Sequence, residues 1–260
     1  MPLSTFLTQS YVTFPPESST VAWAQSVKPS ALAAMVDPSN AEWWRCGETW
    51  FVGVDALGND AEGRVGQGPA LTGAAVDFVR EALHQPHPAS HKAQVSVCFP
   101  GYPKRDEHET AAAHEFRVTR DSAHVDGLHG EGSPKRRFMR ERHDYIFGIS
   151  LSDDDEGAAP FVVWEGSHRI MQEALARAYE GLAPDTWGDV DVTDIYQAAR
   201  AQAFKTCRRL ELPTPTGGAY VVHRFALHGV APWRDSLLDQ RAIVYFRPGH
   251  MPDKNWLAGI

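Results

Sequence analysis

The stretch GAYVVHRFALHGVAPW, residues 218–233, carries two histidines between runs of apolar residues. We predict short strands over residues 218–223 and 226–230, which place His223 and His228 in or beside strands. A third predicted strand, RAIVYFRP at residues 241–248, follows. The C-terminal part of the chain is therefore expected to be built from β-strands.

In the last of these strands, an arginine shares a face with apolar residues. Period-two alternation puts Arg241, Ile243 and Tyr245 on one side. On an inward face, Arg241 would need an anion as its partner, and its planar guanidinium suits a carboxylate held by two hydrogen bonds. The alternative interpretation is an arginine at a strand end whose charge reaches solvent.

Strand patterns also occur upstream of this tail. Period-two or continuous apolar patterns predict strands at residues 10–14, 93–99, 114–120, 145–151, 160–164 and 208–213. Helical spacing predicts helices over residues 72–84, 167–179 and 191–204. A first helix is expected to be capped by Ser18 or Ser19 and to end where Pro29 interferes. This pattern favours a mainly β fold with flanking helices, in one domain over residues 1–260.

The composition limits the kinds of partner and location. The 260 residues carry a formal net charge of −8, which disfavours nucleic acid, because its binding depends on Lys and Arg neutralising phosphates. No stretch approaches the ~20 apolar residues needed to span a bilayer, and the N-terminus lacks a signal-peptide pattern. The three cysteines show neither metal-site nor disulfide-framework spacing. We therefore expect a cytoplasmic protein without a membrane or nucleic-acid partner.

A glycine-rich stretch, DSAHVDGLHGEG at residues 121–132, concentrates side chains that can bind metals. His124 and Asp126 lie two residues apart and can reach one divalent ion where the chain is extended or turning. With a distant histidine they would form the two-histidine, one-carboxylate triad that holds Fe(II) on one face and leaves three positions open. By itself the pattern is weak, and a solvated polar loop is the simpler interpretation.

Four motifs in a fixed order give this stretch its meaning: HVD at 124–126, FVVWEGSH at 161–168, GAYVVHRFALHG at 218–229 and RAIVYF at 241–246. Together they resemble the Fe(II)/2-oxoglutarate-dependent oxygenases, most closely the phytanoyl-CoA dioxygenase-like family. The resemblance implies a double-stranded β-helix (jelly-roll) core over residues 91–250, preceded by a mainly helical N-terminal elaboration over residues 1–90. It also implies that His124, Asp126 and His228 bind Fe(II), and that Arg241 pairs with the far carboxylate of the cosubstrate 2-oxoglutarate.

The implied reaction uses O₂ and 2-oxoglutarate to hydroxylate a small-molecule substrate, with release of succinate and CO₂. Halogenases of this superfamily have a small residue at the carboxylate position, so Asp126 favours hydroxylation or a related C–H oxidation. Two positions depart from the family pattern. Glu165 stands where proline is usual, and Val230 stands where a serine often helps to bind 2-oxoglutarate.

Other interpretations of the same residues stay open. A zinc-dependent hydrolase could use His124, Asp126 and His129, although a further histidine is missing at position 122. A non-catalytic, cupin-like binding protein is a second alternative. Arg234 and Arg247 also follow the distal histidine and are alternatives for the cosubstrate's carboxylate.

The segment after the metal stretch, SPKRRFMRERH at residues 133–143, is rich in positive charge. An exposed helix with solvated charges is one interpretation. The other is that Arg136 and Arg140, on one face of that helix, hold an anionic small-molecule substrate over the iron. His129 is close enough in sequence to the ligands to line the substrate entrance.

Overall fold

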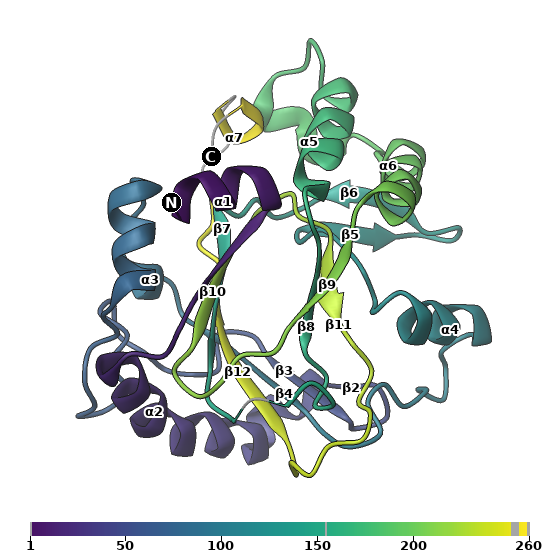
Figure 1. Ribbon diagram of the computed structural model, residues 1–260. Helices are drawn as coiled ribbons and strands as arrows, with labels where there is room; N and C mark the ends of the chain where they lie inside the picture. The colour runs from purple at the N-terminus through teal and green to yellow at the C-terminus, as the bar shows by residue number, and fades with distance from the viewer. Residues whose placement is uncertain (1, 154, 251–254, 259–260) are drawn as a thin grey trace.

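Two antiparallel β-sheets face each other at the centre of the computed structural model, with helices around them (Figure 1). The structure describes residues 2–153, 155–250 and 255–258. The larger sheet has seven strands in the order β1-β10-β7-β12-β4-β3-β2, and the smaller has three in the order β11-β8-β9. This arrangement confirms the predicted jelly-roll core with flanking helices.

The strands come from most of the chain. The larger sheet contains β1 (Tyr11–Phe14), β2 (Trp44–Arg45), β3 (Trp50–Gly53), β4 (Gln94–Cys98), β7 (Tyr145–Ser150), β10 (Ala219–His223) and β12 (Arg241–Phe246). The smaller sheet contains β8 (Phe161–Trp164), β9 (Arg209–Leu212) and β11 (His228–Val230), and a separate hairpin pairs β5 (Leu128–Glu131) with β6 (Arg136–Met139). The first 90 residues thus contribute β1, β2 and β3 to the larger sheet besides their helices.

The helices surround this core. They are α1 (Pro2–Gln9), α2 (Ser18–Val36), α3 (Ala74–Asp77), α4 (Ala111–Thr119), α5 (Ser167–Ala178), α6 (Thr193–Thr206) and α7 (Asn255–Ala258). A π-helical turn, η2 (Phe78–Ala82), continues α3, and short 3₁₀ helices are η1 (Pro38–Trp43), η3 (Pro88–Ser90) and η4 (Pro184–Asp189). Within the described residues, no helix combines the length and apolar character that a membrane span requires.

Part of the space between the two sheets is filled by side chains that both sheets point inward. Ile243 and Tyr245 of β12 pack in one buried cluster with Phe161 and Val163 of β8. The same cluster contains Tyr220 of β10, whose ring lies 4.8 Å from that of Phe161 between centroids. The alternating face predicted for residues 241–245 is therefore the inward face of the jelly roll.

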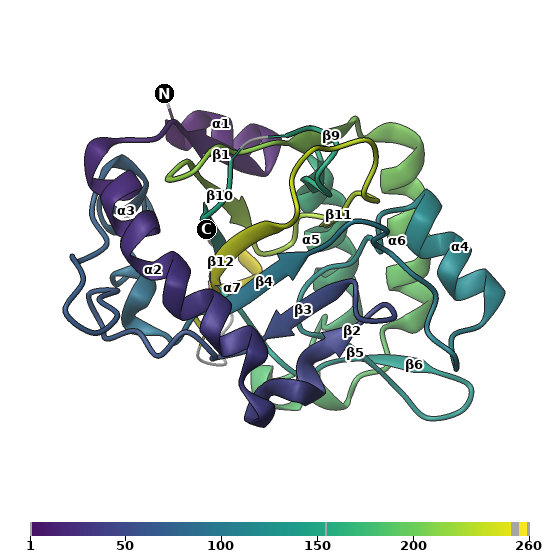
Figure 2. The same cartoon turned by 90° about the horizontal axis from the view of Figure 1, so that it is seen from below.

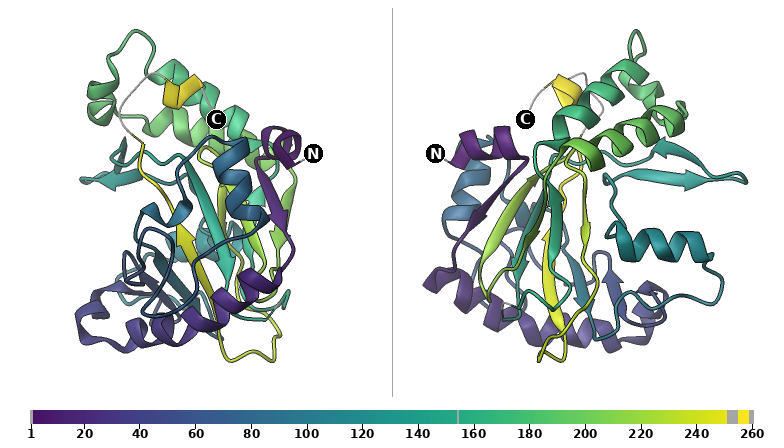
Figure 3. Two further views of the ribbon diagram at one scale, coloured as in Figure 1. Left: turned by 90° about the vertical axis from the view of Figure 1, so that its left-hand side faces the viewer. Right: turned by 45° about the vertical axis from the view of Figure 1, so that its right-hand side comes forward.

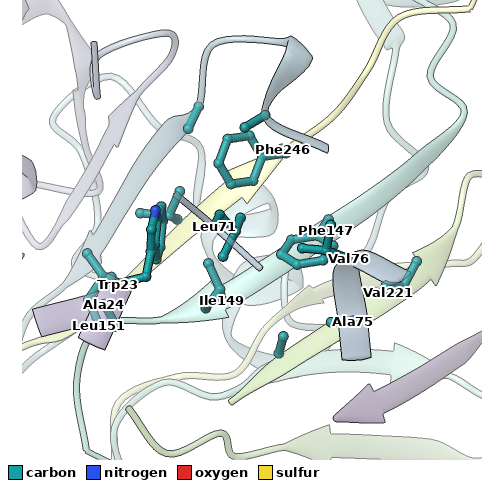
Figure 4. Packing of buried hydrophobic residues seen from close by; sticks show 14 of the residues in the cluster. Trp23, Ala24, Leu71, Ala75, Val76, Phe147, Ile149, Leu151, Val221 and Phe246 are labelled. Carbon is teal, nitrogen blue, oxygen red and sulfur yellow. The ribbon is translucent and has the colours of Figure 1, made fainter. Parts of the chain in front are cut away.

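The outer face of the larger sheet is covered by the N-terminal helices (Figures 2 and 4). Trp23 of α2 is fully buried, with its ring 6.4 Å from Phe246 of β12, and its indole N–H donates to the carbonyl of Gly63. Contrary to prediction, α2 continues through Pro29. Burial of one helix face against a sheet outweighs the hydrogen bond that a proline removes.

Helices α5 and α6 lie side by side at one end of the smaller sheet (Figure 3). Met171 and Leu175 of α5 pack in one buried cluster with Tyr196 and Ala199 of α6. Trp164 of β8 belongs to the same cluster, so the helix pair is anchored directly to the sheet. Both helices were predicted from their apolar spacing.

Two segments differ from their predicted secondary structure. Residues 114–120 lie mostly in helix α4 rather than in a strand, because Thr110 caps the helix by accepting from the backbone N–H of Ala113, and alanines fill its first turn. Residues 136–139 form strand β6 rather than a helix. Pairing with β5 supplies the main-chain partners that a helix would otherwise provide.

Candidate metal centre

The two histidine segments are joined by reciprocal main-chain hydrogen bonds. The N–H of His124 donates to the carbonyl of His228 at 2.9 Å, and the N–H of His228 donates to the carbonyl of His124 at 3.0 Å. This isolated antiparallel bridge connects the glycine-rich stretch to β11. Directly opposed residues point their side chains to the same side, and the two imidazole centroids lie 4.6 Å apart.

The glycine after the distal histidine allows this close approach. A Cβ on Gly229 would lie 2.1 Å from the carbonyl oxygen of Asp121. That carbonyl accepts from the N–H of Val230 at 3.0 Å, so the strand and the stretch are in direct contact. Asp121 itself is buried and forms two hydrogen bonds of 2.7 Å with the guanidinium of Arg209 on β9. The HG motif is therefore a packing requirement of the site.

Asp126 reaches the two imidazoles from a tight turn. Gly127 follows it with a φ of +80°, and a Cβ there would lie 2.0 Å from the carbonyl oxygen of Glu141. The carbonyl of Gly127 accepts from the N–H of Arg140 at 2.9 Å, which fixes the turn against the hairpin. Only glycine fits this combination of positive φ and close backbone contact.

The three side chains present one ligand atom each to a common point. His124 Nε2 lies 3.2 Å from Asp126 Oδ1, and His228 Nε2 lies 3.5 Å from the same oxygen. All three ligand atoms lie within 4.8 Å of one another. Ligands about 2.1 Å from a divalent ion are separated by about 3 Å in octahedral geometry. The separations to Asp126 are close to that value.

The hydrogen bonds of the imidazoles fix which nitrogen faces this point. His124 Nδ1 lies 2.9 Å from the carbonyl of Ser122, and His228 Nδ1 lies 2.9 Å from the carbonyl of Ala226. A carbonyl accepts only, so each Nδ1 carries the proton and each Nε2 of a neutral ring presents a lone pair. Two lone pairs and a carboxylate oxygen that face one another are suited to hold a divalent cation.

The carboxylate of Asp126 has a second neighbour, Arg247, just beyond the end of β12. Arg247 Nη1 lies 3.4 Å from Asp126 Oδ2, on the side away from the imidazoles. Burial by itself raises the pKa of Asp126, but Arg247 and the two neighbouring histidines together hold that pKa well below its usual range. Asp126 is therefore ionised, as a metal ligand must be.

The three side chains face a cavity of about 500 Å³ between the sheets and the β5-β6 hairpin. Its wall is largely apolar, with Phe161 stacked on His228 at a centroid distance of 5.4 Å. Val230 also lines it. The polar groups around the cavity are Gln94, Ser96, His129, Glu141, Tyr245 and Arg247, besides the triad. A ligand set beside a mostly apolar cavity is typical of small-molecule sites.

Arg241 does not line this cavity but lines a separate, small pocket with Asp155 and Leu212. Its guanidinium is buried, and Nη2 donates to the hydroxyl of Tyr245 at 3.4 Å. Within the described residues, Nη1 is buried without a hydrogen-bond partner. Tyr245 connects the two places, because its side chain also lines the cavity. Arg241 is thus a buried cation with an unsatisfied donor, one residue away from the cavity wall.

The other arginines considered for a carboxylate differ from Arg241. Arg234 is half exposed and pairs with Glu211 at 2.6 Å, outside the cavity. Arg247 lines the cavity, but its guanidinium already contacts Asp126 and the side-chain oxygen of Gln94. Of the three, Arg241 alone has a buried donor left open among the residues described here.

The residues expected at the substrate entrance are placed differently from one another. His129 lines the cavity, with Nε2 3.5 Å from a carboxylate oxygen of Glu141. Arg136 and Arg140 lie on or beside β6 and do not line it. Arg136 pairs with Asp191 and Asp194.

Arg140 forms a two-bonded pair with the carboxylate of Glu131, at 2.5 and 2.7 Å. The charges of Arg136 and Arg140 are therefore balanced by neighbouring acids. Their role in holding an anionic substrate stays a prediction, which would require these pairs to open.

The alternative zinc set is not brought together. The described residues contain one group of three potential metal ligands with converging atoms, and it contains His228 rather than His129. Fold and side chains together define a jelly-roll protein with a two-histidine, one-carboxylate ligand set.

No family model matches the chain, and no curated protein sequence matches it. Similar solved structures include the non-heme alpha ketoglutarate dependent carbocyclase SnoK from nogalamycin biosynthesis, which is 13% identical, with 95% of this chain and 83% of that chain covered and a TM-score of 0.49.

EctD from S. alaskensis, solved with 2-oxoglutarate and 5-hydroxyectoine, is 16% identical, with 94% of this chain and 74% of the EctD chain covered and a TM-score of 0.47. HygX from Streptomyces hygroscopicus, solved with nickel, 2-oxoglutarate and hygromycin B, is 16% identical, with 95% and 86% covered and a TM-score of 0.45. Because these identities and TM-scores are low, the chemistry of the site must be inferred from the side chains of this chain.

The sequence interpretation missed one wall of the cavity. Trp50 and Val52 of β3 line it, as do Trp43 and Val54 on either side along the chain. The signal was present in WFVG at residues 50–53, where the partly exposed Trp50 and Val52 alternate with the buried Phe51 and Gly53. The first 90 residues therefore contribute to the site as well as to the scaffold.

Proposed function

We propose that this protein is an Fe(II)- and 2-oxoglutarate-dependent oxygenase that hydroxylates a small molecule, with release of succinate and CO₂. The observation that carries the proposal is the convergence of His124 Nε2, His228 Nε2 and Asp126 Oδ1 beside a cavity. Three ligands on one side of an ion leave positions open for cosubstrates, as the facial triad of non-haem iron oxygenases does. When bound, the iron would supply the oxidising chemistry with O₂ and 2-oxoglutarate.

The chain's own residues have separate tasks in this proposal. His124, Asp126 and His228 hold the ion, and the carbonyls of Ser122 and Ala226 keep both imidazoles in the ligating tautomer. These supporting contacts need no further side chain, because main-chain oxygens accept both hydrogen bonds.

Arg241 is the residue proposed for the far carboxylate of 2-oxoglutarate. Its buried Nη1 has no partner among the described residues, and a carboxylate would satisfy it. The hydroxyl of Tyr245 accepts from its Nη2 and orients the guanidinium. The apolar cavity wall, including Trp50 and Phe161, would exclude water from the reacting groups.

An anaerobic titration tests the metal and cosubstrate together. Purified protein is titrated with Fe(II), then with 2-oxoglutarate, while binding and visible absorbance are followed. We expect one Fe(II) per chain and a new absorption band that needs both components. Stable binding of zinc with no 2-oxoglutarate-dependent band would contradict the oxygenase and favour the hydrolase.

The substrate is proposed to be a small, anionic molecule, such as an acidic metabolite or acyl conjugate. The net charge of −8 disfavours nucleic acid, and the arginines of the β5-β6 hairpin are the candidate contacts for a small anion. Succinate release is measured over neutral, cationic and anionic compounds at varied salt. Turnover restricted to neutral or cationic compounds would rule out this substrate class. So would turnover of anions at a rate that changes neither with salt nor in the Arg136→Ala/Arg140→Ala double variant.

We also propose a cytoplasmic location. Cys46, Cys98 and Cys207 are free thiols, which persist in a reducing compartment. Fractionation of cells that produce the full chain tests this directly, with the soluble fraction expected to hold the protein.

A further inference from the structure

The two oxygens of Asp126 have different surroundings. Oδ1 faces the imidazole nitrogens of His124 and His228, at 3.2 and 3.5 Å. Oδ2 faces the guanidinium of Arg247, whose Nη1 lies 3.4 Å away. The carboxylate is buried, with an exposed fraction of 7% for its side chain. The side chain is thus divided between a metal-facing oxygen and an arginine-facing oxygen.

Arg247 is itself held in place from several directions. Its Nη2 donates to the side-chain oxygen of Gln94, a buried residue at the start of β4. Its main-chain carbonyl accepts from Nδ1 of His143 at 3.2 Å. Because Tyr245 pairs with Gln94 across β12 and β4, Arg247 lies just past the last paired residues of these strands. Arg247 therefore contacts the ligand from a position fixed by the larger sheet.

A carboxylate can bind a divalent ion through one oxygen or through both. Two-oxygen binding by Asp126 would turn Oδ2 toward the ion and break its contact with Arg247. It would also occupy a fourth position on the ion, where a cosubstrate would otherwise bind. The contact between Arg247 and Oδ2 opposes that change.

We propose that Arg247 is a positioning residue that keeps Asp126 a one-oxygen ligand, so that three positions on the ion stay open toward the cavity. The inference rests on the metal site of the proposed function but not on the oxidation chemistry. Arg247 is the one Lys or Arg among the described residues that line the cavity. Its charge has a cost, because it lies beside a bound cation and weakens the binding of that cation.

The proposal predicts an unusual combination of effects for Arg247→Gln. Without the guanidinium, Asp126 is free to bind through both oxygens, and the nearby positive charge is gone. We expect Mn(II) to bind about threefold to tenfold more tightly, because one electrostatic contact of this kind is worth on the order of 1 kcal/mol. At the same time, the ion should lose one bound water.

Mn(II) serves as the probe because it prefers six oxygen or nitrogen ligands and its bound waters can be counted. Affinity is measured from the electron paramagnetic resonance signal of free Mn(II), and bound water from water-proton relaxation. In the unmodified protein we expect about three exchangeable waters, the six positions less three protein ligands. Arg247→Gln should lower this to about two, and Gln94→Ala, which frees Arg247 from one partner, should give a smaller decrease.

Two further variants separate positioning from other effects. Arg234→Gln removes a guanidinium outside the cavity and should leave both the water count and the Mn(II) affinity unchanged. Arg247→Lys keeps a positive charge but not the planar fork that spans Asp126 and Gln94, so it should restore part of the water count. A merely structural role for Arg247 would predict weaker Mn(II) binding in Arg247→Gln.

The outcomes distinguish this inference from the proposed function. Three waters in both the unmodified protein and Arg247→Gln would overturn the inference and leave the metal site standing. Weaker Mn(II) binding in Arg247→Gln, or two waters already in the unmodified protein, would overturn it as well. If the unmodified protein bound neither Mn(II) nor Fe(II), the proposed function and the inference would both be wrong.

Discussion

At the residue scale, two main-chain carbonyls decide how the imidazoles of the site behave. The carbonyls of Ser122 and Ala226 each hold the Nδ1 proton of a histidine two residues further along the chain. In both histidines, the orientation of the ring is therefore fixed by the same hydrogen bond to a carbonyl two residues earlier, although the histidines lie in different segments. These hydrogen bonds cannot be predicted from the pattern of side chains, because the acceptors are main-chain atoms.

Removal of one ligand should abolish stoichiometric metal binding. Asp126→Ala and His228→Ala are each expected to lose Fe(II) binding, because two remaining ligands hold the ion too weakly. Anaerobic equilibrium dialysis with Fe(II) measures this. His129→Ala is the matched histidine control and should still bind one ion. If His129→Ala lost the ion and His228→Ala kept it, the ligand assignment would be wrong.

Replacement of Arg241 should affect the cosubstrate. Arg241→Ala is expected to raise the apparent KM for 2-oxoglutarate at least about tenfold, because a charge-assisted hydrogen-bonded pair is worth about 2 kcal/mol. Direct 2-oxoglutarate binding to the Fe(II)-loaded protein gives a second readout. Arg234→Ala should leave both unchanged. A loss in Arg234→Ala instead would transfer the role to that residue.

At the scale of elements, the site depends on how closely β11 packs against residues 121–126. A Cβ on Gly229 would overlap the carbonyl oxygen of Asp121, and neither backbone can move without breaking the bridge between His124 and His228. The hairpin at Gly130 is more tolerant, since a Cβ there would meet its nearest atom at 3.7 Å. Of these two glycines near the site, Gly130 can therefore accept a side chain and Gly229 cannot.

Gly229→Ala should therefore destabilise the protein and weaken metal binding together. We expect a loss of roughly 1–3 kcal/mol in the free energy of unfolding, typical of a group forced into packed surroundings. Urea unfolding and Fe(II) titration measure the two effects. Gly130→Ala is the control and should change neither. Equal behaviour of the two variants would argue against the packing requirement.

Another element, α1, is attached through buried histidines. His168 Nδ1 lies 3.0 Å from the hydroxyl of Ser10, and its Nε2 lies 3.2 Å from the carbonyl of Leu7 at the end of α1. The ring of His223 lies 4.6 Å away between centroids. Burial lowers the pKa of His168 to about 4, and burial with His168 beside it holds the pKa of His223 well below its usual range.

These two histidines should make the whole molecule less stable in mild acid. Below a pH of about 6.5 the unfolded chain binds protons that the folded chain does not, so stability falls as the pH drops toward about 4. Each histidine contributes at most about 1.4 kcal/mol per pH unit in this window. Urea unfolding at pH 7.5, 6.5 and 5.5 measures the slope. His168→Phe should flatten it, and an unchanged slope would contradict this origin.

At the scale of the whole molecule, the sequence predicted the core better than the cavity. The strands at residues 145–150, 219–223 and 241–246 were predicted because each is apolar along its length and bounded by turn residues. The helix at residues 111–119 was missed because its cap, Thr110, and its alanines carry the signal rather than apolar spacing. The pattern of apolar residues therefore does not predict a helix whose start is set by a capping residue.

The site was predictable in part for a similar reason. The proposed metal ligands belong to short motifs, and the structure brings His124, Asp126 and His228 together. The cavity wall from β3 and the contact between Arg247 and Gln94 could not be predicted, because both depend on which strands lie side by side. The ion pairs of Arg136 with Asp191 and Asp194 join segments far apart in sequence, so a charge run alone could not indicate them.

The bridge between His124 and His228 has a consequence for the order of events during synthesis. The two histidines lie roughly a hundred residues apart, and contacts of this range form late because the intervening chain must first be closed into a loop. A ribosome that has released only the HVD segment has released one half of a site. Until β11 emerges, His124 and Asp126 have no distal histidine beside them, so the metal binding proposed above would have to follow the synthesis of β11.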